Sequence, residues 1–227
     1  VAQAGRKGPV VLALPEDVLY MSGQENPVKP AHIIQPGLDM HHFNQAMHAL
    51  ASAKKPMIIA GGGNWNSRAC EDLRVWANRE GVPIASSFRS QDLIDNLDPA
   101  FAGDLGIGAN PALVKRIQEA DVLLVIGERL GEMTTAGYTI LTPPKASNTL
   151  IHVLSSPDEL GRVYRPEFAI NCSPENFCAA LDSIKMGNGY RVERMKEAHA
   201  EYLAWSAPVT VPGHMQLAHI MASLPAS

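Results

Sequence analysis

The sequence has few cysteines, no excess of positive charge and no long apolar run. Its cysteines, Cys70, Cys172 and Cys178, are odd in number and form no Cys-x-x-Cys pair. We therefore interpret them as small apolar residues in a reducing cytoplasm. The formal net charge of -4 gives no electrostatic reason to expect nucleic acid or an anionic membrane as a partner. No apolar stretch approaches the roughly 20 residues that span a bilayer.

The local patterns of a nucleophilic triad or of a metal site are also missing. No Gly-x-Ser-x-Gly elbow occurs in the sequence. His41, His42 and His48 share one predicted helix, but they lack the spacing and the convergent acids of a zinc site. The sequence thus assigns no catalytic residue and no metal ligand within these 227 residues.

Both ends of the sequence carry apolar patterns that lack an adjacent predicted element to pack against. The run "GPVVLALP" (8–15) has the composition of a buried parallel strand, yet a long irregular stretch with several prolines follows it. The last residues, "GHMQLAHIMASLPAS" (213–227), have the pattern of an amphipathic helix. With a start at Val1 rather than Met, these features lead us to expect a piece of a longer polypeptide.

Between these ends, predicted strands alternate with predicted helices. This alternation requires a parallel sheet covered on both faces, that is, an α/β doubly wound Rossmann-like fold. Residues 186–213 have the composition of a linker that passes through a charged helix. Strands are expected at 57–61, 82–88, 121–127, 148–153 and 167–172, and helices at 39–53, 67–79, 111–120 and 173–184.

The stretch "PMIIAGGGNWNSRA" (56–69) admits two interpretations. Gly61 and Gly63 fit the first two positions of a Gly-x-Gly-x-x-Gly phosphate cradle, but Asn66 stands at the third. The next strand ends in Ser86, Ser87 and Phe88, where a nicotinamide-binding protein has an acid for the ribose. A nicotinamide dehydrogenase is therefore disfavoured. A phosphate cradle and a tight strand-to-helix turn both stay open.

A second glycine follows another predicted strand, in "IGERLGEMTTAGYT" (126–139). Gly127 and Arg129 could place a positive charge beside a diphosphate that crosses the end of the sheet. Alternatively, Arg129 pairs with Glu128 or Glu132 on a solvated loop. These alternatives also stay open.

Taken together, these segments resemble a known family. "GPVVLALPEDV" (8–18), "KPMIIAGGG" (55–63), "FAGDLGIGANP" (101–111), "ADVLLVIGERL" (120–130) and "IHV…PDELGRVYRP" (151–166) are similar to a thiamine diphosphate-dependent enzyme of the acetolactate synthase type. The resemblance follows the family's order over nearly the whole chain. It implies that residues 1–30 are the tail of a pyrimidine-binding domain plus a linker. Residues 31–186 would be the central domain, and residues 187–227 a linker and the start of a pyrophosphate-binding domain.

The resemblance also implies where the chemistry lies. The family acts on 2-keto acids with thiamine diphosphate and Mg²⁺, and its catalytic glutamate would precede Val1. Its Gly-Asp-Gly magnesium motif would follow Ser227, because "GDLGIGAN" (103–110) departs from that motif and Asp104 is better interpreted as a loop residue. We expect the chain alone to be inactive, and to be monomeric or only weakly associated in dilute solution. The full-length enzyme would be a homo-oligomer, formed with the remaining domains of the same polypeptide.

In some family members the central domain binds FAD or ADP, and in others it binds neither. The FAD-binding members carry Gly-Ala-Arg-Phe-Asp-Asp-Arg after the fifth strand, of which only Gly127 and Arg129 remain here. They also carry Asp-x-Asp-Pro where this chain has Leu154, Ser155, Ser156 and Pro157, so that neither acid is retained. We therefore expect little binding of FAD or ADP. A free-standing nucleotide-binding module without thiamine chemistry is the alternative interpretation. The positions that match the family's cofactor-lining loops are Gly61, Gly62, Gly63, Ser86, Ser87, Phe88, Gly103, Gly127 and Arg129.

Overall fold

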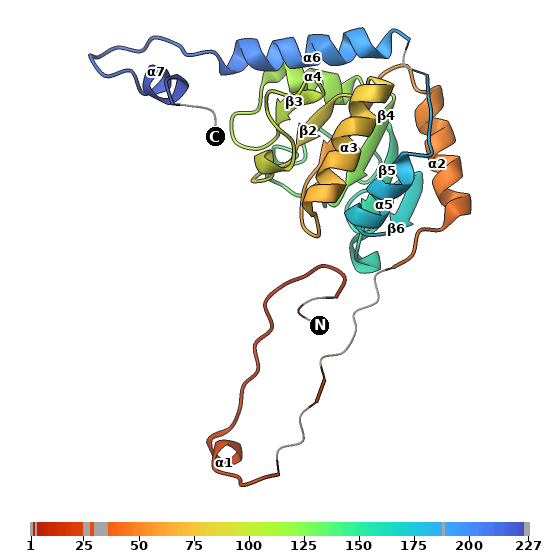
Figure 1. Cartoon of the computed structure of the whole chain (residues 1–227), viewed down its shortest axis with the longest axis vertical. Helices are drawn as coiled ribbons and strands as arrows, with labels where there is room; N and C mark the ends of the chain where they lie inside the picture. Colours follow the sequence, from red (N-terminus) through yellow and green to blue (C-terminus); the bar gives the residue numbers. More distant parts are fainter. Residues whose placement is uncertain (1, 3, 25–27, 30–35, 188, 225–227) are drawn as a thin grey trace.

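The computed structural model describes residues 2, 4–24, 28–29, 36–187 and 189–224 (Figure 1). Its centre is one six-stranded sheet in which every neighbouring pair is parallel, in the order β3-β2-β1-β4-β5-β6. This is the doubly wound α/β fold that the alternating pattern predicted. The strands are β1 (Pro56–Ala60), β2 (Ile84–Ser86), β3 (Phe101–Asp104), β4 (Val122–Ile126), β5 (Thr149–Leu154) and β6 (Phe168–Asn171).

Helices lie on both sides of this sheet. α2, α3 and α5 contribute buried residues to one apolar cluster, together with strand residues such as Ile58 and Leu124. α4 and the long β4–β5 connection contribute to the cluster on the opposite face, with Ile59 and Leu123. The helices are α1 (Glu16–Leu19), α2 (Met40–Ser52), α3 (Ser67–Glu80), α4 (Pro111–Gln118), α5 (Pro174–Leu181), α6 (Arg191–Ser206) and α7 (Leu217–Ala222), with short 3-10 turns η1 (Gln91–Leu93) and η2 (Pro157–Glu159).

The helix boundaries follow from local side-chain chemistry. The side chains of Asp39, Asn66, Asn110 and Ser173 each accept a hydrogen bond from a backbone N–H in the first turn of α2, α3, α4 and α5 respectively. These bonds satisfy donors that have no partner inside the helix. Gly81 ends α3 in the left-handed conformation, with φ 71°, as its glycine predicted. These boundaries therefore needed little help from tertiary packing.

Helix α6 packs against strand β3, which was not among the predicted strands. The ring of Tyr202 in α6 packs edge-on against Phe101 in β3, with centroids 4.9 Å apart. The ring nitrogen Nδ1 of His199 lies 2.8 Å from the carbonyl oxygen of Phe101. Arg116 of α4 also binds Glu201 of α6 through two hydrogen bonds, of 2.5 and 2.8 Å. The charged helix of the predicted linker thus packs against the sheet. The domain boundary at residue 186 stays a prediction.

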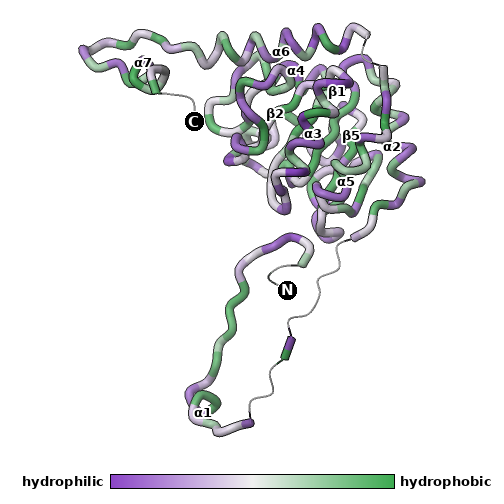
Figure 2. Tube along the Cα trace, viewed as in Figure 1, coloured by the Kyte–Doolittle hydropathy of each residue, from purple (hydrophilic) through white to green (hydrophobic). Residues whose placement is uncertain are grey.

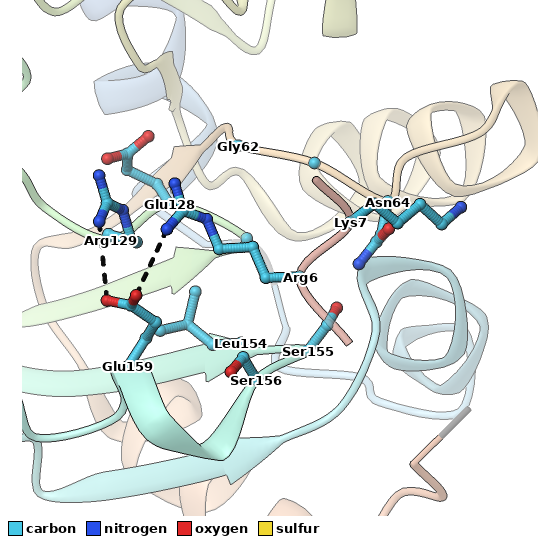
Figure 3. A pocket seen from close by; sticks show the side chains of 12 residues that line it. Arg6, Lys7, Gly62, Asn64, Glu128, Arg129, Leu154, Ser155, Ser156 and Glu159 are labelled. Carbon is cyan, nitrogen blue, oxygen red and sulfur yellow. Dashed lines mark hydrogen bonds and ion pairs between the residues drawn. The ribbon is translucent and has the colours of Figure 1, made fainter. Parts of the chain in front are cut away.

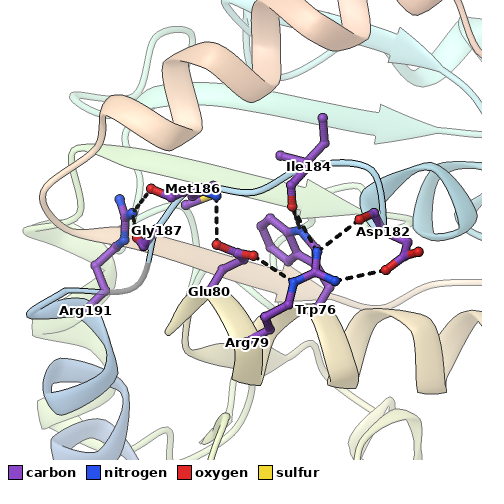
Figure 4. Close-up of polar contacts among 8 residues, drawn as sticks. All are labelled: Trp76, Arg79, Glu80, Asp182, Ile184, Met186, Gly187 and Arg191. Carbon is purple, nitrogen blue, oxygen red and sulfur yellow. Dashed lines mark hydrogen bonds and ion pairs between the residues drawn. The ribbon is translucent and has the colours of Figure 1, made fainter.

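The strap, which we define as residues 182–187 between α5 and α6, is fastened to α3 (Figure 4). The indole Nε1 of Trp76 donates to the carbonyl of Ile184 at 3.1 Å. Glu80 is 3% exposed, and its carboxylate accepts from Arg79 at 2.8 Å and from the backbone N–H of Met186 at 2.7 Å. These bonds fix the direction in which the chain enters α6.

Arg191, the first residue of α6, completes this attachment. It is 7% exposed and donates to the carbonyls of Met186 at 2.7 Å and of Gly187. Its other terminal nitrogen donates to Ala51 and Ala53 at the end of α2, at 3.1 and 3.3 Å. A single buried guanidinium therefore joins the end of α2, the strap and α6; Figure 4 shows its contacts with the strap.

The strand prediction for Gly8–Pro15 was wrong. None of these residues lies in a strand, and Val11 and Leu12 are 92% and 79% exposed. Figures 1 and 2 show the hydrophobic segment extending away from the sheet toward α1. A strand requires a partner for its backbone groups and apolar side chains, and the described residues provide none beside this segment.

The C-terminal pattern is helical over a shorter range than expected. α7 spans Leu217–Ala222, whereas the pattern covered 213–227, of which residues 225–227 lie outside the described part. Leu217 is 68% exposed and Met221 is 59% exposed. The apolar face of this helix is therefore in contact with solvent in the described chain.

Candidate functional site

A cleft of about 350 Å³ opens at the carboxyl ends of β1, β4 and β5. From β1 the chain proceeds outward to β2 and β3, and from β4 it proceeds in the other direction to β5 and β6. Loops that leave β1 and β4 therefore diverge, and such a switch point is where ligands bind in open parallel sheets. The cleft is lined by Arg6, Lys7, Gly62, Gly63, Asn64, Gly127, Glu128, Arg129, Leu154, Ser155, Ser156 and Glu159 (Figure 3).

The structure brings together Gly62, Gly63, Gly127 and Arg129 from the predicted set. The other predicted positions lie elsewhere. Gly61 is buried beneath the cleft, and Ser86 and Ser87 are fully buried at the end of β2. Phe88 packs next to Gly106, and Gly103 lies in β3 beside Leu113 and Tyr202. Apart from Gly61, these positions belong to the β2–β3 half of the sheet and do not line the cleft.

The glycines at the ends of β1 and β4 are required by close packing of the backbone. A Cβ on Gly62 would lie 2.0 Å from the carbonyl oxygen of Gly127, and one on Gly127 would lie 2.3 Å from that of Gly61. Gly62 and Gly127 also have φ of 71° and 76°, which L side chains rarely adopt. Gly63, by contrast, has open space around the position of a Cβ. The glycine loop is therefore chiefly a tight turn, the second of the two interpretations.

The N-terminal segment forms one wall of the cleft. The side-chain amide of Asn64 donates to the carbonyl of Gly5 at 2.7 Å. The guanidinium of Arg6 donates to Oε1 of Glu159 at 3.4 Å. Residues separated by more than fifty positions in the chain thus meet at this edge of the sheet. Sequence reasoning did not identify Arg6, Lys7 or Glu159, because no local pattern predicts that these segments meet.

Glu159 is surrounded by guanidinium groups. Its Oε1 lies 3.4 Å from Arg6 and 3.5 Å from Arg162, and its Oε2 lies 3.8 Å from Arg129. The side chain of Glu159 is 13% exposed, so these charges are only partly screened by water. Arg129 is thus paired with Glu159, and not with Glu128 or Glu132, which was one of the two alternatives that the sequence left open.

A buried histidine shapes the opposite wall. Nε2 of His152, in β5, lies 2.8 Å from the carbonyl oxygen of Glu128, so this nitrogen carries the proton. His152 is 2% exposed, and its burial lowers the pKa of the ring below the usual 6.5. The carboxylate of Glu128 turns back to accept the backbone N–H of Leu130 at 3.1 Å. The loop after β4 is therefore held by its own side chain and by a neutral imidazole.

The cleft does not fit the diphosphate of FAD or ADP as it stands. The space beside Gly62 is filled by the backbone at Gly127, and the carboxylate of Glu159 occupies the position between Arg6 and Arg129. A diphosphate at that place would meet a carboxylate of the same charge sign, which is unfavourable at short distance.

In the part of the chain that the structure describes, no cluster of three or more His, Cys, Asp or Glu side chains is placed to hold a metal ion. Within the same described residues, no helix combines the length and the apolar character that a membrane span requires. Asp104, which the sequence placed in a loop, ends β3 and accepts a hydrogen bond from Gln91 at 3.3 Å.

Comparison with known proteins identifies the family. Residues 43–181 match the family described as thiamine pyrophosphate enzyme, central domain. A sulfoacetaldehyde acetyltransferase of Castellaniella defragrans is 30% identical over 210 residues, covering 89% of this chain and 35% of that protein. An acetolactate synthase large subunit of Corynebacterium glutamicum is 27% identical over 176 residues, covering 75% of this chain and 27% of that protein.

The chain spans about a third of the length of such relatives, since it covers 35% of one sulfoacetaldehyde acetyltransferase and 33% of another, from Alcaligenes xylosoxydans. The family match itself covers more than half of this chain and contains all six strands and helices α3, α4 and α5. The chain therefore belongs to the thiamine pyrophosphate enzyme family, of which residues 43–181 form the central domain.

Proposed function

We propose that the chain is part of a thiamine diphosphate-dependent carboligase or lyase that acts on 2-keto acids, as acetolactate synthase does. The observation that carries this proposal is the family match over residues 43–181, together with several relatives named as acetolactate synthase large subunits. In this proposal residues 1–30 belong to the preceding domain and its linker, and residues 187–227 lead into the following domain.

The contribution of this chain to the reaction is structural. Thiamine diphosphate and Mg²⁺ would bind in the other domains, which also supply the catalytic glutamate and the magnesium motif. The partners are then those domains of the same polypeptide, further subunits of a homo-oligomer and a small 2-keto acid, in the cytoplasm. The central domain would set the distance and orientation between the domains on either side, through α6 and the N-terminal segment.

A second substrate is favoured by a separate observation. The sulfoacetaldehyde acetyltransferases reach 30% and 28% identity and cover 89% and 87% of this chain. The acetolactate synthases from Corynebacterium glutamicum and Escherichia coli (isozyme 2) reach 27% and 26% and each cover 75%. Acetyl transfer from sulfoacetaldehyde is therefore the alternative reaction within the same cofactor class.

The test is to express the full reading frame that contains this segment and to supply thiamine diphosphate and Mg²⁺, with inorganic phosphate added as an acceptor for the acetyl group in the sulfoacetaldehyde assay. Carbon dioxide and acetolactate formed from pyruvate support the proposal, whereas consumption of sulfoacetaldehyde alone supports the second substrate. The 227-residue chain, assayed in parallel, should show no turnover. A reading frame without a glutamate-bearing domain upstream and a Gly-Asp-Gly motif downstream would overturn the proposal.

The oligomeric state of the chain offers a further check. We propose that the main subunit interface is formed by the catalytic domains, so the chain by itself should be monomeric or weakly associated. Light scattering at micromolar concentration measures this directly. A stable tetramer would contradict the proposal, because it would place the interface within these residues.

The free-standing nucleotide-binding module is tested by ligand binding. Glu159 and the packed glycines oppose a diphosphate, so the purified chain should be colourless and millimolar FAD or ADP should shift its melting temperature little. A ligand that binds only the native state stabilises by about 2.7 kcal/mol at a hundredfold excess over Kd, a shift of several degrees in a domain of this size. A yellow preparation, or a shift of that size, would favour the module.

A further inference from the structure

The carboxylate of Glu159 has the position and the contacts of a bound anion. It lies at the end of the turn η2, directly after β5, and faces Arg6 and Arg129 from below in Figure 3. Both of its oxygens are used, Oε1 by Arg6 and Arg162 and Oε2 by Arg129. Three guanidinium groups thus converge on a single carboxylate.

The rest of the cleft would suit an anion larger than a carboxylate. Lys7, Ser155 and Ser156 line it, and their side chains make no hydrogen bond or ion pair with any described residue. The side chain of Glu128, the other acid in the lining, is turned toward the backbone of Leu130. Without Glu159, therefore, Arg6, Lys7 and Arg129 would face a cleft with hydroxyl donors, and the one acid left in its lining, Glu128, is bound to the backbone of Leu130.

The size of the cleft also favours a ligand larger than a carboxylate. Its volume of about 350 Å³ exceeds what a carboxylate fills, and it lies within the usual range of small-molecule sites. Gly63 is exposed and leaves open space at its Cβ position, so a ligand can approach its backbone there. The cleft therefore has room for two linked phosphate groups.

We propose that Glu159 is an internal counter-anion that blocks a diphosphate-binding cleft and, in the same contact, ties the N-terminal segment to the sheet. A diphosphate binds Arg6 and Arg129 only by displacing the carboxylate. The affinity of the cleft for anions is therefore set by Glu159, and its removal uncovers the site. This inference concerns the cleft alone and holds for either substrate proposed above.

The experiment measures binding of inorganic pyrophosphate by calorimetry at low ionic strength, with this chain and with the full-length protein. Glu159→Gln removes the charge and retains the size of the side chain. Asp158→Asn is the matched control, because this substitution makes the same change in net charge. Asp158 is the exposed neighbour of Glu159 and does not line the cleft. Glu159→Gln should bind pyrophosphate at least about tenfold more tightly than the wild-type chain, since a like charge within about 4 Å is removed.

Further arms separate the site from general electrostatics and from misfolding. The double variant Glu159→Gln with Arg129→Gln should lose the gain, because the released guanidinium is then absent. Glu159→Asp keeps the charge but shortens the reach, and should give an intermediate affinity. Pyrophosphate, ADP and AMP are compared in the Glu159→Gln variant: equal binding of pyrophosphate and ADP with weaker AMP identifies the diphosphate as the recognised group.

Two outcomes would overturn the proposal. One is that Glu159→Gln binds pyrophosphate no more tightly than Asp158→Asn, and the other is that the gain survives the loss of Arg129. If circular dichroism shows that Glu159→Gln does not fold, the affinity of Glu159→Asp for pyrophosphate is the deciding measurement. An affinity of Glu159→Asp equal to that of the wild-type chain would then count against the proposal.

Discussion

Two polar networks fasten peripheral segments to the same sheet, and they differ in burial. At the strap, Glu80 and Arg191 are 3% and 7% exposed. At the cleft, the side chains of Arg6 and Glu159 are 56% and 13% exposed. The strap therefore resembles the interior of the domain in its surroundings, whereas the contact of the N-terminal segment is open to water and salt.

The two networks also differ in their partners. Glu80 binds the backbone N–H of Met186, and Arg191 binds only backbone carbonyls. Backbone partners cannot rotate away, and a buried group left without its partner carries a large desolvation cost. The contact between Arg6 and Glu159 joins the ends of two flexible side chains, and such groups exchange partners at a small cost in free energy. The comparison teaches that the strap is held by buried backbone contacts, whereas the cleft contact is the weaker of the two attachments and the one that the proposed displacement of Glu159 requires.

The largest expected effect comes from breaking the strap. Glu80→Ala leaves the backbone N–H of Met186 without its partner and removes one of the contacts of the Arg79 guanidinium, and should lower the free energy of unfolding by about 3 kcal/mol. Asp182→Ala is the control, because the Asp182 side chain binds the same arginine but is 88% exposed; it should cost under about 1 kcal/mol. Urea denaturation measures both, and equal losses would show that burial does not distinguish them.

A slightly smaller effect is expected from the glycine turn under the cleft. Gly62→Ala forces a Cβ to within 2.0 Å of the Gly127 carbonyl oxygen at a positive φ, and should cost about 2 kcal/mol or more. Gly63→Ala is the matched control, since nothing lies within 4 Å of its Cβ position. Thermal melts compare the two variants. A destabilised Gly63→Ala would mean that the turn is tighter than the structure shows.

His152 gives the cleft wall a dependence on pH. Because burial lowers its pKa in the folded protein, the unfolded chain binds a proton below about pH 6.5 that the folded chain does not. The free energy of unfolding should therefore be unaffected above this pH and should fall below it, by at most about 1.4 kcal/mol per pH unit, until the folded pKa is reached.

Urea midpoints at several pH values test this dependence. His152→Gln should remove this part of the pH dependence, while the same change at the exposed His214 should not. A pH profile that is identical in wild type and His152→Gln would assign the dependence to other groups. Glu128, whose carbonyl accepts from His152, is the charged neighbour to examine next.

The smallest effect on stability is expected at the N-terminal contact. Arg6→Gln removes a partly exposed ion pair and should change the free energy of unfolding by under about 1 kcal/mol. Hydrogen exchange should nevertheless become faster at Gly8, whose backbone N–H donates to the carbonyl of Ala2 at 3.2 Å, because the ion pair that holds this segment against the sheet is lost while the bond from Asn64 to Gly5 remains. A large loss of stability in Arg6→Gln would remove the distinction between cleft and strap.

Much of the central fold could be predicted because it depends on local chemistry. The wholly buried β4, Val122–Ile126, was evident from an unbroken apolar run, and the start of α4 was evident from Asn110 followed by Pro111. β3 was missed because its four residues, Phe101–Asp104, have neither a long apolar run nor alternation. It is a strand because β2 supplies backbone partners and α6 covers its outer side.

The site shows the same division. The sequence alone determined that a glycine follows β1 and another follows β4, because each glycine comes directly after an apolar run that predicts a strand. Only the tertiary structure decided what these glycines do, because the close approach of Gly62 to Gly127 exists only when two strands distant in sequence lie side by side. It also decided that Glu159 meets Arg6 across the cleft. No local pattern determines that meeting, since it depends on the path of the folded chain between residues 6 and 159.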